Sequence, residues 1–241
     1  MIDKVKLLAK GKAKDMYTST DPNALVMVFR DDISAFNAEK VATLSGKGAV
    51  NQAINAALMQ YLEGKGVKTH FIRSLNEREC LVHKLEMLPV ECVIRNISAG
   101  SYAKRFGIET GKELGSSIFE LFYKNDALGD PMIRDEHAIY FGWATEKDIA
   151  EMKHLSFRVN ALLSEYFHEH GLTLVDFKLE FGRLNGELVL ADEISPDGCR
   201  IWDSSTQAIL DKDRFRKDMG DVVEGYQKIA KKLRIPNNLF E

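Results

Sequence analysis

The sequence predicts an α+β protein with a β-rich first half and a mixed α/β second half. Up to residue 95 the patterns are those of strands, with one helical stripe of apolar residues. Beyond it, helical and strand patterns alternate. The chain has 241 residues, 45% hydrophobic and 29% charged, which suits one large domain or two small ones. A cleft between two such halves is a usual place for a nucleotide.

The first half is expected to contain a hairpin, a helix and four further strands. The hairpin turns at Gly11-Lys12-Ala13-Lys14, and the helix ends at Gly64 and Gly66. We expect the boundary between the halves near Met87-Leu88-Pro89, which gives lobes of residues 1–87 and 88–241. In chain order the elements are residues 5–9 paired with 15–18, then 24–30, 49–63, 69–73, 80–85 and 90–95.

The second half is expected to be built around one long helix and one hairpin. Thr145, with Asp148 three residues on, is typical of a helix start, and this helix should end before Gly171. Asn185-Gly186 is a strong hairpin turn. In chain order we expect a helix at residues 101–106, the long helix, a strand at 174–182, its return strand at 188–194 and a final helix at 211–233.

The strand at residues 174–182 alternates strictly between apolar and charged side chains. Its charged side carries Asp176, Lys178 and Glu180, each about 6.6 Å from the next. Such a row can hold a hard cation and a polyphosphate together, because carboxylate oxygens bind Mg2+ and an ammonium group neutralises phosphate. A surface ladder of salt bridges is the alternative, because such ladders are common.

The turn at Asn185-Gly186 allows two registers for the hairpin. A simple two-residue turn places Glu193 opposite Lys178 and turns Asp192 to the apolar face. A bulge or a three-residue loop places Asp192 across from Glu180 instead. We favour this second register, with a divalent metal ion between Glu180 and Asp192, because a carboxylate buried among apolar residues is costly.

A candidate phosphate site follows the strand that ends at Arg95. Gly100-Ser101 begin a helix there, and a helix N-terminus with a hydroxyl group and a nearby guanidinium group can bind a monophosphate. Arg200, after the turn at Pro196-Asp197-Gly198, could converge on the same phosphate. A plain serine N-cap beside a solvated arginine remains the alternative for this segment alone.

Three loops carry polar residues whose role the pattern leaves open. Gly11 at the hairpin tip lets backbone amides approach a phosphate, and Lys12 and Lys14 add positive charge, although basic turns are common. Residues 31–37 and 124–131 are rich in the Asp and Asn that dominate ordinary turns.

Composition argues against several classes of partner. A net charge of -3 gives no sign of the positively charged surface that binds nucleic acid. Apolar runs are far shorter than the roughly 20 residues of a membrane span, and the N-terminus lacks the apolar region of a signal peptide. Three cysteines without a CxxC pair are expected to be buried or half-buried free thiols of a reducing cytosol. We therefore expect a cytoplasmic protein with no nucleic-acid or membrane partner.

Two strings resemble the SAICAR synthetases (phosphoribosylaminoimidazole-succinocarboxamide synthases) of purine biosynthesis. One is residues 88–95 with Ala99-Gly100-Ser101, and the other is residues 174–182, followed by residues 192–197. The resemblance covers nearly the whole chain and is to the short, single-function bacterial form. The chain departs from the family pattern at Asn37, where many members carry Asp.

The resemblance implies a two-lobed fold related to ATP-grasp and kinase-like nucleotide clamps. It also implies the ATP- and Mg2+-dependent joining of L-aspartate to the carboxylate of carboxyaminoimidazole ribonucleotide (CAIR), which yields ADP and phosphate. That carboxylate is a poor electrophile and must first become an acyl phosphate, so its phosphorylation needs metal and cationic stabilisation. Family members are usually oligomers, and we expect a homodimer.

Roles for individual residues follow from the resemblance, position by position. The charged residues of the strand are the expected catalytic residues: Lys178 would contact the reacting carboxylate or the γ-phosphate, Asp176 would anchor the ribonucleotide or Lys178, and Glu180 would ligate Mg2+ together with Asp192. The residues expected around ATP are Lys12, Ala13 and Lys14 over the phosphates, and Lys84, Leu85, Glu86 and Met87 in the adenine slot. Those expected at the other substrates are Arg95, Ser101 and Arg200 at the 5′-phosphate, and Ser34, Asn37, Lys124 and Asp130 near the aspartate and imidazole sites.

Two other functions remain as alternatives. A kinase-like phosphotransferase would use the same metal and lysine row, but the chain has no HRD-type catalytic loop and no DFG. A non-catalytic nucleotide-binding module would need no second phosphate site, so Arg95, Ser101 and Arg200 argue against it. Release of ADP that depends on both co-substrates would distinguish the ligase from both.

Overall fold

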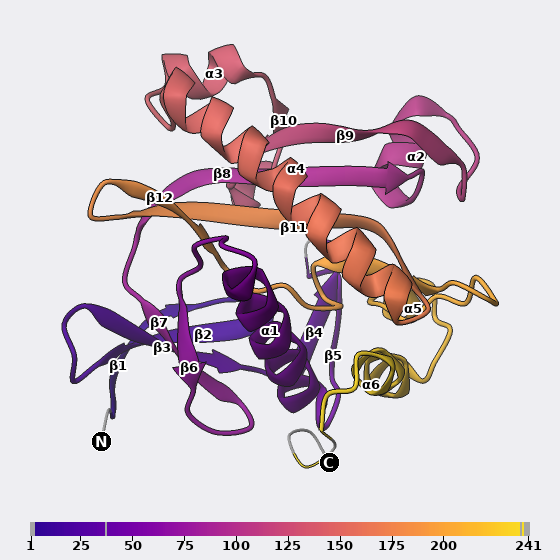
Figure 1. Cartoon of the computed structure of the whole chain (residues 1–241), viewed down its shortest axis with the longest axis horizontal. Helices are drawn as coiled ribbons and strands as arrows, with labels where there is room; N and C mark the ends of the chain where they lie inside the picture. The colour runs from indigo at the N-terminus through magenta and orange to yellow at the C-terminus, as the bar shows by residue number, and fades with distance from the viewer. Residues whose placement is uncertain (1–2, 37, 237, 239–241) are drawn as a thin grey trace.

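The computed structural model describes residues 3–36, 38–236 and 238. It contains a five-stranded sheet, a six-stranded sheet and a small two-stranded one, and every strand pair within them is antiparallel. Helices pack against both large sheets (Figure 1). The expected α+β class is confirmed.

The five-stranded sheet is built from the first half of the chain, as the strand patterns predict. Its order is β1 (Lys4–Lys10), β2 (Lys14–Ser19), β3 (Ala24–Phe29), β7 (Glu79–His83) and β6 (Phe71–Ser74). The hairpin closes at Gly11, whose backbone N–H donates to the carbonyl of Lys14 at 2.8 Å. Helix α1 (Lys47–Gly64) packs against this sheet, and β4 (Asp32–Ala35) pairs with β5 (Lys40–Thr43).

The six-stranded sheet holds the charged strand at its centre. Strand β11 (Leu172–Leu184) pairs with three others, which are β8 (Glu86–Ile97), β12 (Glu187–Ala191) and β13 (Cys199–Asp203). Strands β9 (Glu113–Tyr123) and β10 (Met132–Ile133) complete the sheet beyond β8. The long helix α4 (Glu146–Glu169) crosses it (Figure 1), and its N-terminus has the expected capping box of Thr145 and Asp148.

One hydrophobic core connects the two large sheets. It extends from Met27 in β3 through Leu58 in α1 to Phe177 in β11 and Phe167 in α4. Val175 belongs to a separate small cluster, and the pairing of β11 with β13 shifts register between Leu174 and Asp176. The expected boundary after residue 87 lies near the start of β8, the strand that leads from one half to the other.

The prediction of one final helix is wrong. The structure has two, α5 (Asp213–Arg216) and α6 (Val222–Lys232). Between them Asp218, Gly220 and Asp221 all have positive φ angles, which break the right-handed helix. The short helix α2 (Gly100–Phe106), by contrast, starts one residue from the expected position, and α3 (Asp135–Tyr140) adds a helix that the pattern did not indicate.

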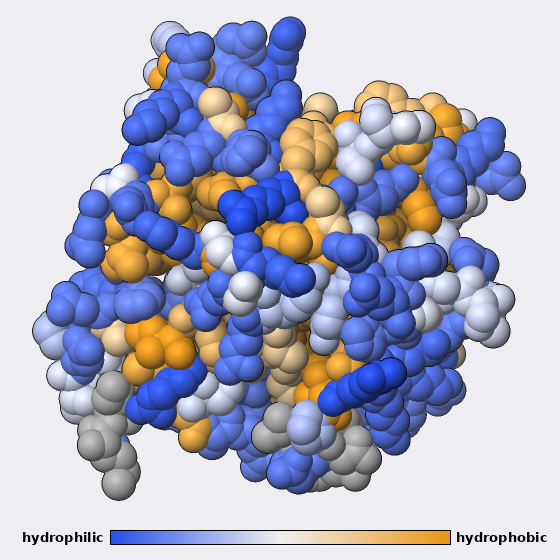
Figure 2. Space-filling view, in the orientation of Figure 1, coloured by the Kyte–Doolittle hydropathy of each residue, from blue (hydrophilic) through white to orange (hydrophobic). Residues whose placement is uncertain are grey.

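The surface is mixed in character. Figure 2 shows hydrophilic side chains over most of one face, with apolar side chains in separate patches. Among the described residues, no helix has both the length and the apolar character needed to cross a membrane. Cys80, Cys92 and Cys199 are buried and free, as expected.

Candidate active site

The charged row of β11 lies inside the protein rather than on its surface. Asp176 is 3% exposed and Glu180 is 1% exposed, although they occupy the face that alternation assigns to water. A plain surface ladder is therefore excluded. Burial of charged groups requires partners of opposite charge, and each member of the row has them.

Lys178 is surrounded by three carboxylates from three strands or their ends. Its Nζ atom lies 2.6 Å from Glu180 Oε1, 3.2 Å from Glu91 Oε1 and 3.1 Å from Asp192 Oδ2. Burial alone would lower the pKa of Lys178, but the charges of Asp192, Glu180 and Glu91 together raise it well above its usual value. The ammonium group therefore stays charged at neutral pH.

The register that we favoured for the hairpin is wrong. Glu180 pairs with Ala191, as in the simple two-residue turn, in which Asn185 and Gly186 both have positive φ. Asp192 still reaches the charged face, because β12 ends at Ala191 and Asp192 adopts a left-handed backbone with φ 63°. The change in backbone conformation, not a change in register, brings Asp192 beside Lys178.

Asp192 connects the charged row to the hairpin of the other sheet. Lys14 at the start of β2 forms ion pairs with both Asp192 and Glu193. Burial would raise the pKa of Asp192, but Lys14, Lys178 and Lys124 hold it well below its usual value. Asp192 Oδ2 lies near Lys178 without hydrogen-bond alignment and has no hydrogen-bond partner among the described residues.

A cavity of about 350 Å³ opens beside these charges. One end is apolar and the other carries Lys14, Lys124, Glu180 and Asp192. Of the residues expected in an adenine slot, Lys84, Leu85 and Met87 line it. The Glu86 side chain is not among the lining residues and is 79% exposed. The remaining lining residues are Leu8, Ala9, Met16, Leu25, Met27, His70, Val82 and His83.

The wall of this cavity depends on a missing side chain. A Cβ atom at Gly182 would lie 2.8 Å from Leu85 Cβ and 3.0 Å from Met87 Sδ. Glycine in β11 therefore lets the start of β8 approach the central strand closely. Lys12 lies apart from the cavity lining, and its Nζ atom is 2.7 Å from Asp126 Oδ1. Ala13 is also absent from the lining.

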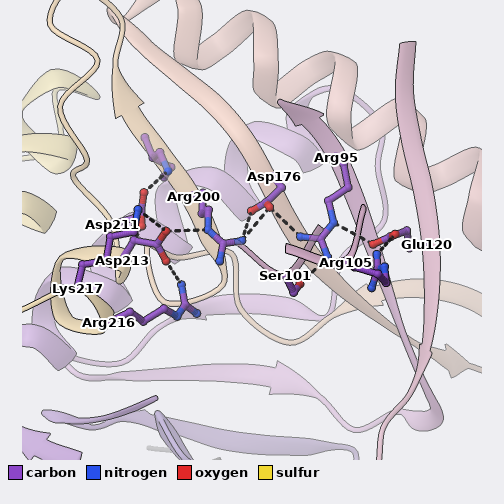
Figure 3. A network of polar contacts seen from close by, with 11 residues as sticks. Arg95, Ser101, Arg105, Glu120, Asp176, Arg200, Asp211, Asp213, Arg216 and Lys217 are labelled. Atoms are coloured by element: carbon purple, nitrogen blue, oxygen red, sulfur yellow. Dashed lines mark hydrogen bonds and ion pairs between the residues drawn. The ribbon is translucent and has the colours of Figure 1, made fainter. Parts of the chain in front are cut away.

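The three residues expected at a phosphate lie together, as Figure 3 shows. Arg95 Nη1 donates to Asp176 Oδ2 at 2.7 Å, and Arg200 Nη1 donates to the same oxygen at 2.8 Å. Arg95 Nη2 lies 3.5 Å from Ser101 Oγ at the start of α2. Asp176 thus holds two guanidinium groups side by side. Among the described residues, no direct contact joins Asp176 to Lys178.

Two further carboxylates, Glu120 and Asp213, flank the arginine pair on its outer sides (Figure 3). Arg95 Nε donates to Glu120 Oε2 at 3.0 Å, and Arg200 Nε donates to Asp213 Oδ2 at 3.0 Å. Asp211 lies beside Asp213, and in the part of the chain that the structure describes no hydrogen bond joins its carboxylate to the arginine pair. Its carboxylate accepts hydrogen bonds from the backbone N–H groups of Ile201 and Asp213, each at 2.8 Å. Burial raises the pKa of Asp211 to about 7.

The remaining expected residues are not all gathered at this site. Lys124 forms an ion pair with Glu180. Asp130 accepts a hydrogen bond from the backbone of Asn125 at 2.9 Å, which stabilises its own loop. Ser34 lines a separate open cavity together with Lys12. Asn37 is outside the residues that the structure describes.

The donor set fits a hard divalent cation that also binds phosphate. No group of three or more His, Cys, Asp or Glu side chains is arranged to hold a metal in the described part of the chain. Mg2+ does not need one, because it usually keeps several waters and binds one or two carboxylates plus substrate phosphates. Glu180 and Asp192 provide two buried carboxylates on either side of Lys178, and no described residue donates a hydrogen bond to Asp192 Oδ2.

Several residues of the site were missed at the sequence level. Alternation along β8 puts Glu91 on the same face as Arg95, but only the pairing with β11 brings it to Lys178. Glu193 was considered opposite Lys178 only in the register that we did not favour, and in the structure it contacts Lys14. His70 gave no signal, because its contact with Asp192 joins segments 122 positions apart.

Comparisons with known proteins show the family of this chain. Residues 7–233 match the model of the SAICAR synthetase family. A phosphoribosylaminoimidazole-succinocarboxamide synthase of Pseudomonas aeruginosa is 52% identical over 235 residues, which are 98% of this chain and 100% of the relative. The crystal structure of such a synthase from Ehrlichia chaffeensis is 47% identical with a TM-score of 0.94, covering 96% of this chain and 99% of that one. A SAICAR synthetase (Type-2) in complex with ADP is 45% identical with a TM-score of 0.91, covering 93% and 96%. The chain belongs to the SAICAR synthetase family.

Proposed function

We propose that this protein is the ATP-dependent ligase that condenses L-aspartate with CAIR to give SAICAR, ADP and phosphate in de novo purine biosynthesis. The observation that carries the proposal is the presence of two clusters of positively charged side chains along one strand. Asp176, with its two arginines, and Glu180, at the cavity, are about 13 Å apart along β11, and Lys178 lies between them. That spacing leaves room for a ribonucleotide on one side and a polyphosphate on the other.

ATP is assigned to the cavity of about 350 Å³ between the two large sheets. Its apolar end, near Leu85 and Met87, suits a purine base, and its charged end suits phosphates. Lys14 points positive charge into that end, and the related structure with ADP supports the assignment. Lys12 and Ala13, at the tip of the same hairpin, would cover the phosphates. In this proposal residues 1–87 and 88–241 act as the two lobes of the clamp.

Glu180 and Asp192 would hold Mg2+ at the charged end of the cavity. When bound, the ion neutralises phosphate charge and so favours phosphoryl transfer. The lysines that now neutralise these carboxylates, Lys14 and Lys178, would turn toward the phosphate oxygens. This exchange keeps the buried charges paired in both states.

The ribonucleotide is assigned to the arginine pair. Two guanidinium groups held by one carboxylate leave other N–H groups free to donate to phosphate oxygens, and Ser101 adds a hydroxyl group. Asp176 acts here by fixing Arg95 and Arg200, rather than through Lys178. The imidazole carboxylate would then extend along β11 toward Lys178.

The chemistry follows from this placement. The CAIR carboxylate attacks the γ-phosphorus of ATP, the bond from that phosphorus to the β–γ bridging oxygen breaks, and ADP leaves. Lys178, charged and fixed by three carboxylates, stabilises the developing negative charge. The amino group of aspartate then attacks the acyl phosphate, phosphate leaves and the nitrogen loses a proton. We propose that Ser34, Lys124 and Asp130 contribute to binding of aspartate or the imidazole.

The experiment that tests the proposal is ADP release by the purified protein with ATP, Mg2+, aspartate and CAIR. ADP should form only when both co-substrates are present. Asp192→Ala and Glu180→Ala should each lower kcat by about 100-fold or more, because each removes a proposed ligand of the Mg2+ that neutralises phosphate charge in the transition state. Glu187→Ala, an exposed carboxylate on β12, is the matched control and should retain turnover. ADP release without aspartate would favour a phosphotransferase.

Two predictions from the sequence complete the proposal, which are residence in the cytoplasm and assembly as a homodimer. Neither nucleic acid nor a membrane is a proposed partner. Sedimentation equilibrium at several protein concentrations tests the dimer, for which a mass near 27.2 kDa would be the contrary result.

A further inference from the structure

The backbone that brings Asp192 into the site is held by His70, which directly precedes strand β6 of the five-stranded sheet. The backbone carbonyl of Asp192 lies 2.8 Å from His70 Nε2, and both residues are buried. His70 belongs to the segment between α1 and β6, whereas Asp192 follows β12 (Figure 1). Because a carbonyl oxygen only accepts hydrogen bonds, Nε2 carries the hydrogen in this contact.

The residues on either side of Asp192 are fixed as well. The backbone N–H of His70 donates to the carbonyl of Leu190 at 2.8 Å. The backbone N–H of Leu190 donates in turn to the carbonyl of Lys68 at 3.1 Å. After Asp192, the N–H of Ile194 donates to Asn55 Oδ1 at 2.9 Å. The chain is thus attached before and after Asp192, and the imidazole of His70 holds the peptide in between.

The left-handed backbone of Asp192 needs such support. A φ of 63° is unfavourable for a residue with a side chain, although Asp tolerates it better than most. In an extended conformation the simple register would turn the carboxylate to the apolar face, away from Lys178. The position of the carboxylate therefore depends on whatever selects the left-handed conformation.

We propose that His70 is a positioning residue that holds Asp192 in this conformation and thereby sets the affinity of the site for the Mg2+–nucleotide complex. The inference rests on the proposed function, because it takes Asp192 as a metal ligand. His70 itself acts through the Asp192 carbonyl group.

The test uses two substitutions of equal length. In His70→Gln the amide nitrogen occupies the position of Nε2 and can still donate, whereas His70→Met has a methyl group there. Isothermal titration with ADP is measured with and without Mg2+. We expect His70→Met to weaken Mg2+-dependent ADP binding by about tenfold, and His70→Gln to stay within about twofold of the native protein. Binding of ADP without Mg2+ should change little in either variant.

A double-mutant cycle separates positioning from simple lining of the cavity. In an Asp192→Ala background, where the carboxylate is gone, His70→Met should have no further effect on Mg2+-dependent binding. An equal loss with and without Mg2+, or the same loss in that background, would overturn the proposal. Thermal unfolding checks that each variant is folded, and His70→Asn, whose amide is too short to reach, replaces His70→Met if that variant does not fold.

Failure of this inference is distinguishable from failure of the proposed function. If the native protein binds ADP with Mg2+ and His70→Met binds it equally well, the inference is wrong and the ligase remains. If the native protein releases no ADP with both co-substrates present, the ligase is wrong, whatever the histidine variants do.

Discussion

At the scale of single residues, the absence of a side chain at Gly100 shapes the candidate phosphate site. A Cβ atom there would lie 2.1 Å from Arg200 Nη2 and 2.4 Å from its Cζ. Gly100→Ala should therefore displace the Arg200 guanidinium. We expect the KM for CAIR to rise about 10- to 100-fold, the range for loss of hydrogen bonds to a charged group, while the KM for ATP changes little.

Gly107→Ala is the matched control for that prediction. Gly107 ends the same helix with a similar positive φ, 62° against 51° for Gly100, but a Cβ atom there would meet no described atom within 4 Å. It introduces the same kind of backbone strain without touching Arg200. An equal rise in KM for both variants would mean that strain in α2, not the position of Arg200, causes the effect.

The sequence predicted the chemistry of individual residues better than their backbone conformations. The carboxylates and the lysine of β11 were identified because strict alternation exposes them on one face. The position of the Asp192 carboxylate depends on the left-handed backbone conformation of Asp192 itself. Alternation of side chains along a strand does not predict such a conformation. For the same reason the contact of Glu193 with Lys14 was not predicted.

At the scale of elements, a buried ion pair joins α1, α6 and the loop that follows Asp192. Lys47 Nζ lies 2.6 Å from Asp197 Oδ2, Asn51 Nδ2 donates to the same oxygen at 2.8 Å, and Tyr226 Oη donates to Asp197 Oδ1 at 2.7 Å. The Lys47 side chain is 0% exposed and that of Asp197 is 3% exposed. Loss of one member leaves the other buried without its counter-charge.

Lys47→Met should lower the free energy of unfolding by about 3 to 5 kcal/mol, the cost of breaking a buried pair from one side. Urea denaturation measures it. Lys68→Met, which removes an exposed pair with Glu187, is the control and should change stability by less than about 1 kcal/mol. Similar losses in the two variants would contradict the special role of the buried pair.

Elements with strong local signals were predicted, and those that depend on tertiary contacts were not. The capping box of Thr145 and the turn at Asn185-Gly186 are local, and both are confirmed. The final helix was drawn through Gly220, because glycine in an amphipathic pattern only lowers helix propensity. In the structure the chain turns at Gly220. Gly225 packs closely against Leu210, because a Cβ atom added at Gly225 would lie only 2.7 Å from the Leu210 carbonyl oxygen.

At the scale of the whole molecule, stability should depend on the protonation of Asp211. Burial raises its pKa to about 7 from the ordinary 3.8 of an aspartate, so the folded state binds more protons than the unfolded state between those pH values. Stability contributed by this group is therefore lost as pH rises through that window, by about 4 kcal/mol in total. Asp211→Asn removes the titration but also one backbone hydrogen bond, whose cost does not vary with pH.

The measurement is the free energy of unfolding of both proteins from pH 4 to pH 7. The free energy of unfolding of the native protein should fall steadily relative to that of Asp211→Asn as pH rises. Other groups titrate alike in both proteins and cancel in the difference. A difference that is constant across the window would show that Asp211 is ionised throughout.

The overall class could be predicted, whereas the meeting of distant segments could not. Composition, strand patterns and one helical stripe were enough for an α+β protein. The pairing of β8 with β11, which places Glu91 at Lys178 and Arg95 at Asp176, joins residues more than 80 positions apart. Arg95 and Arg200 were expected to converge on one phosphate, but their shared contact with Asp176 depends on the pairing of strands and could not be predicted.

The central claim is that Lys178 and its neighbours promote transfer of a phosphoryl group to the CAIR carboxylate. The most direct measurement uses CAIR labelled with 18O in that carboxylate, with mass analysis of the phosphate released. The acyl phosphate route predicts one 18O atom in each phosphate, because the carboxylate oxygen that attacks phosphorus leaves with it. Phosphate without 18O would contradict the account.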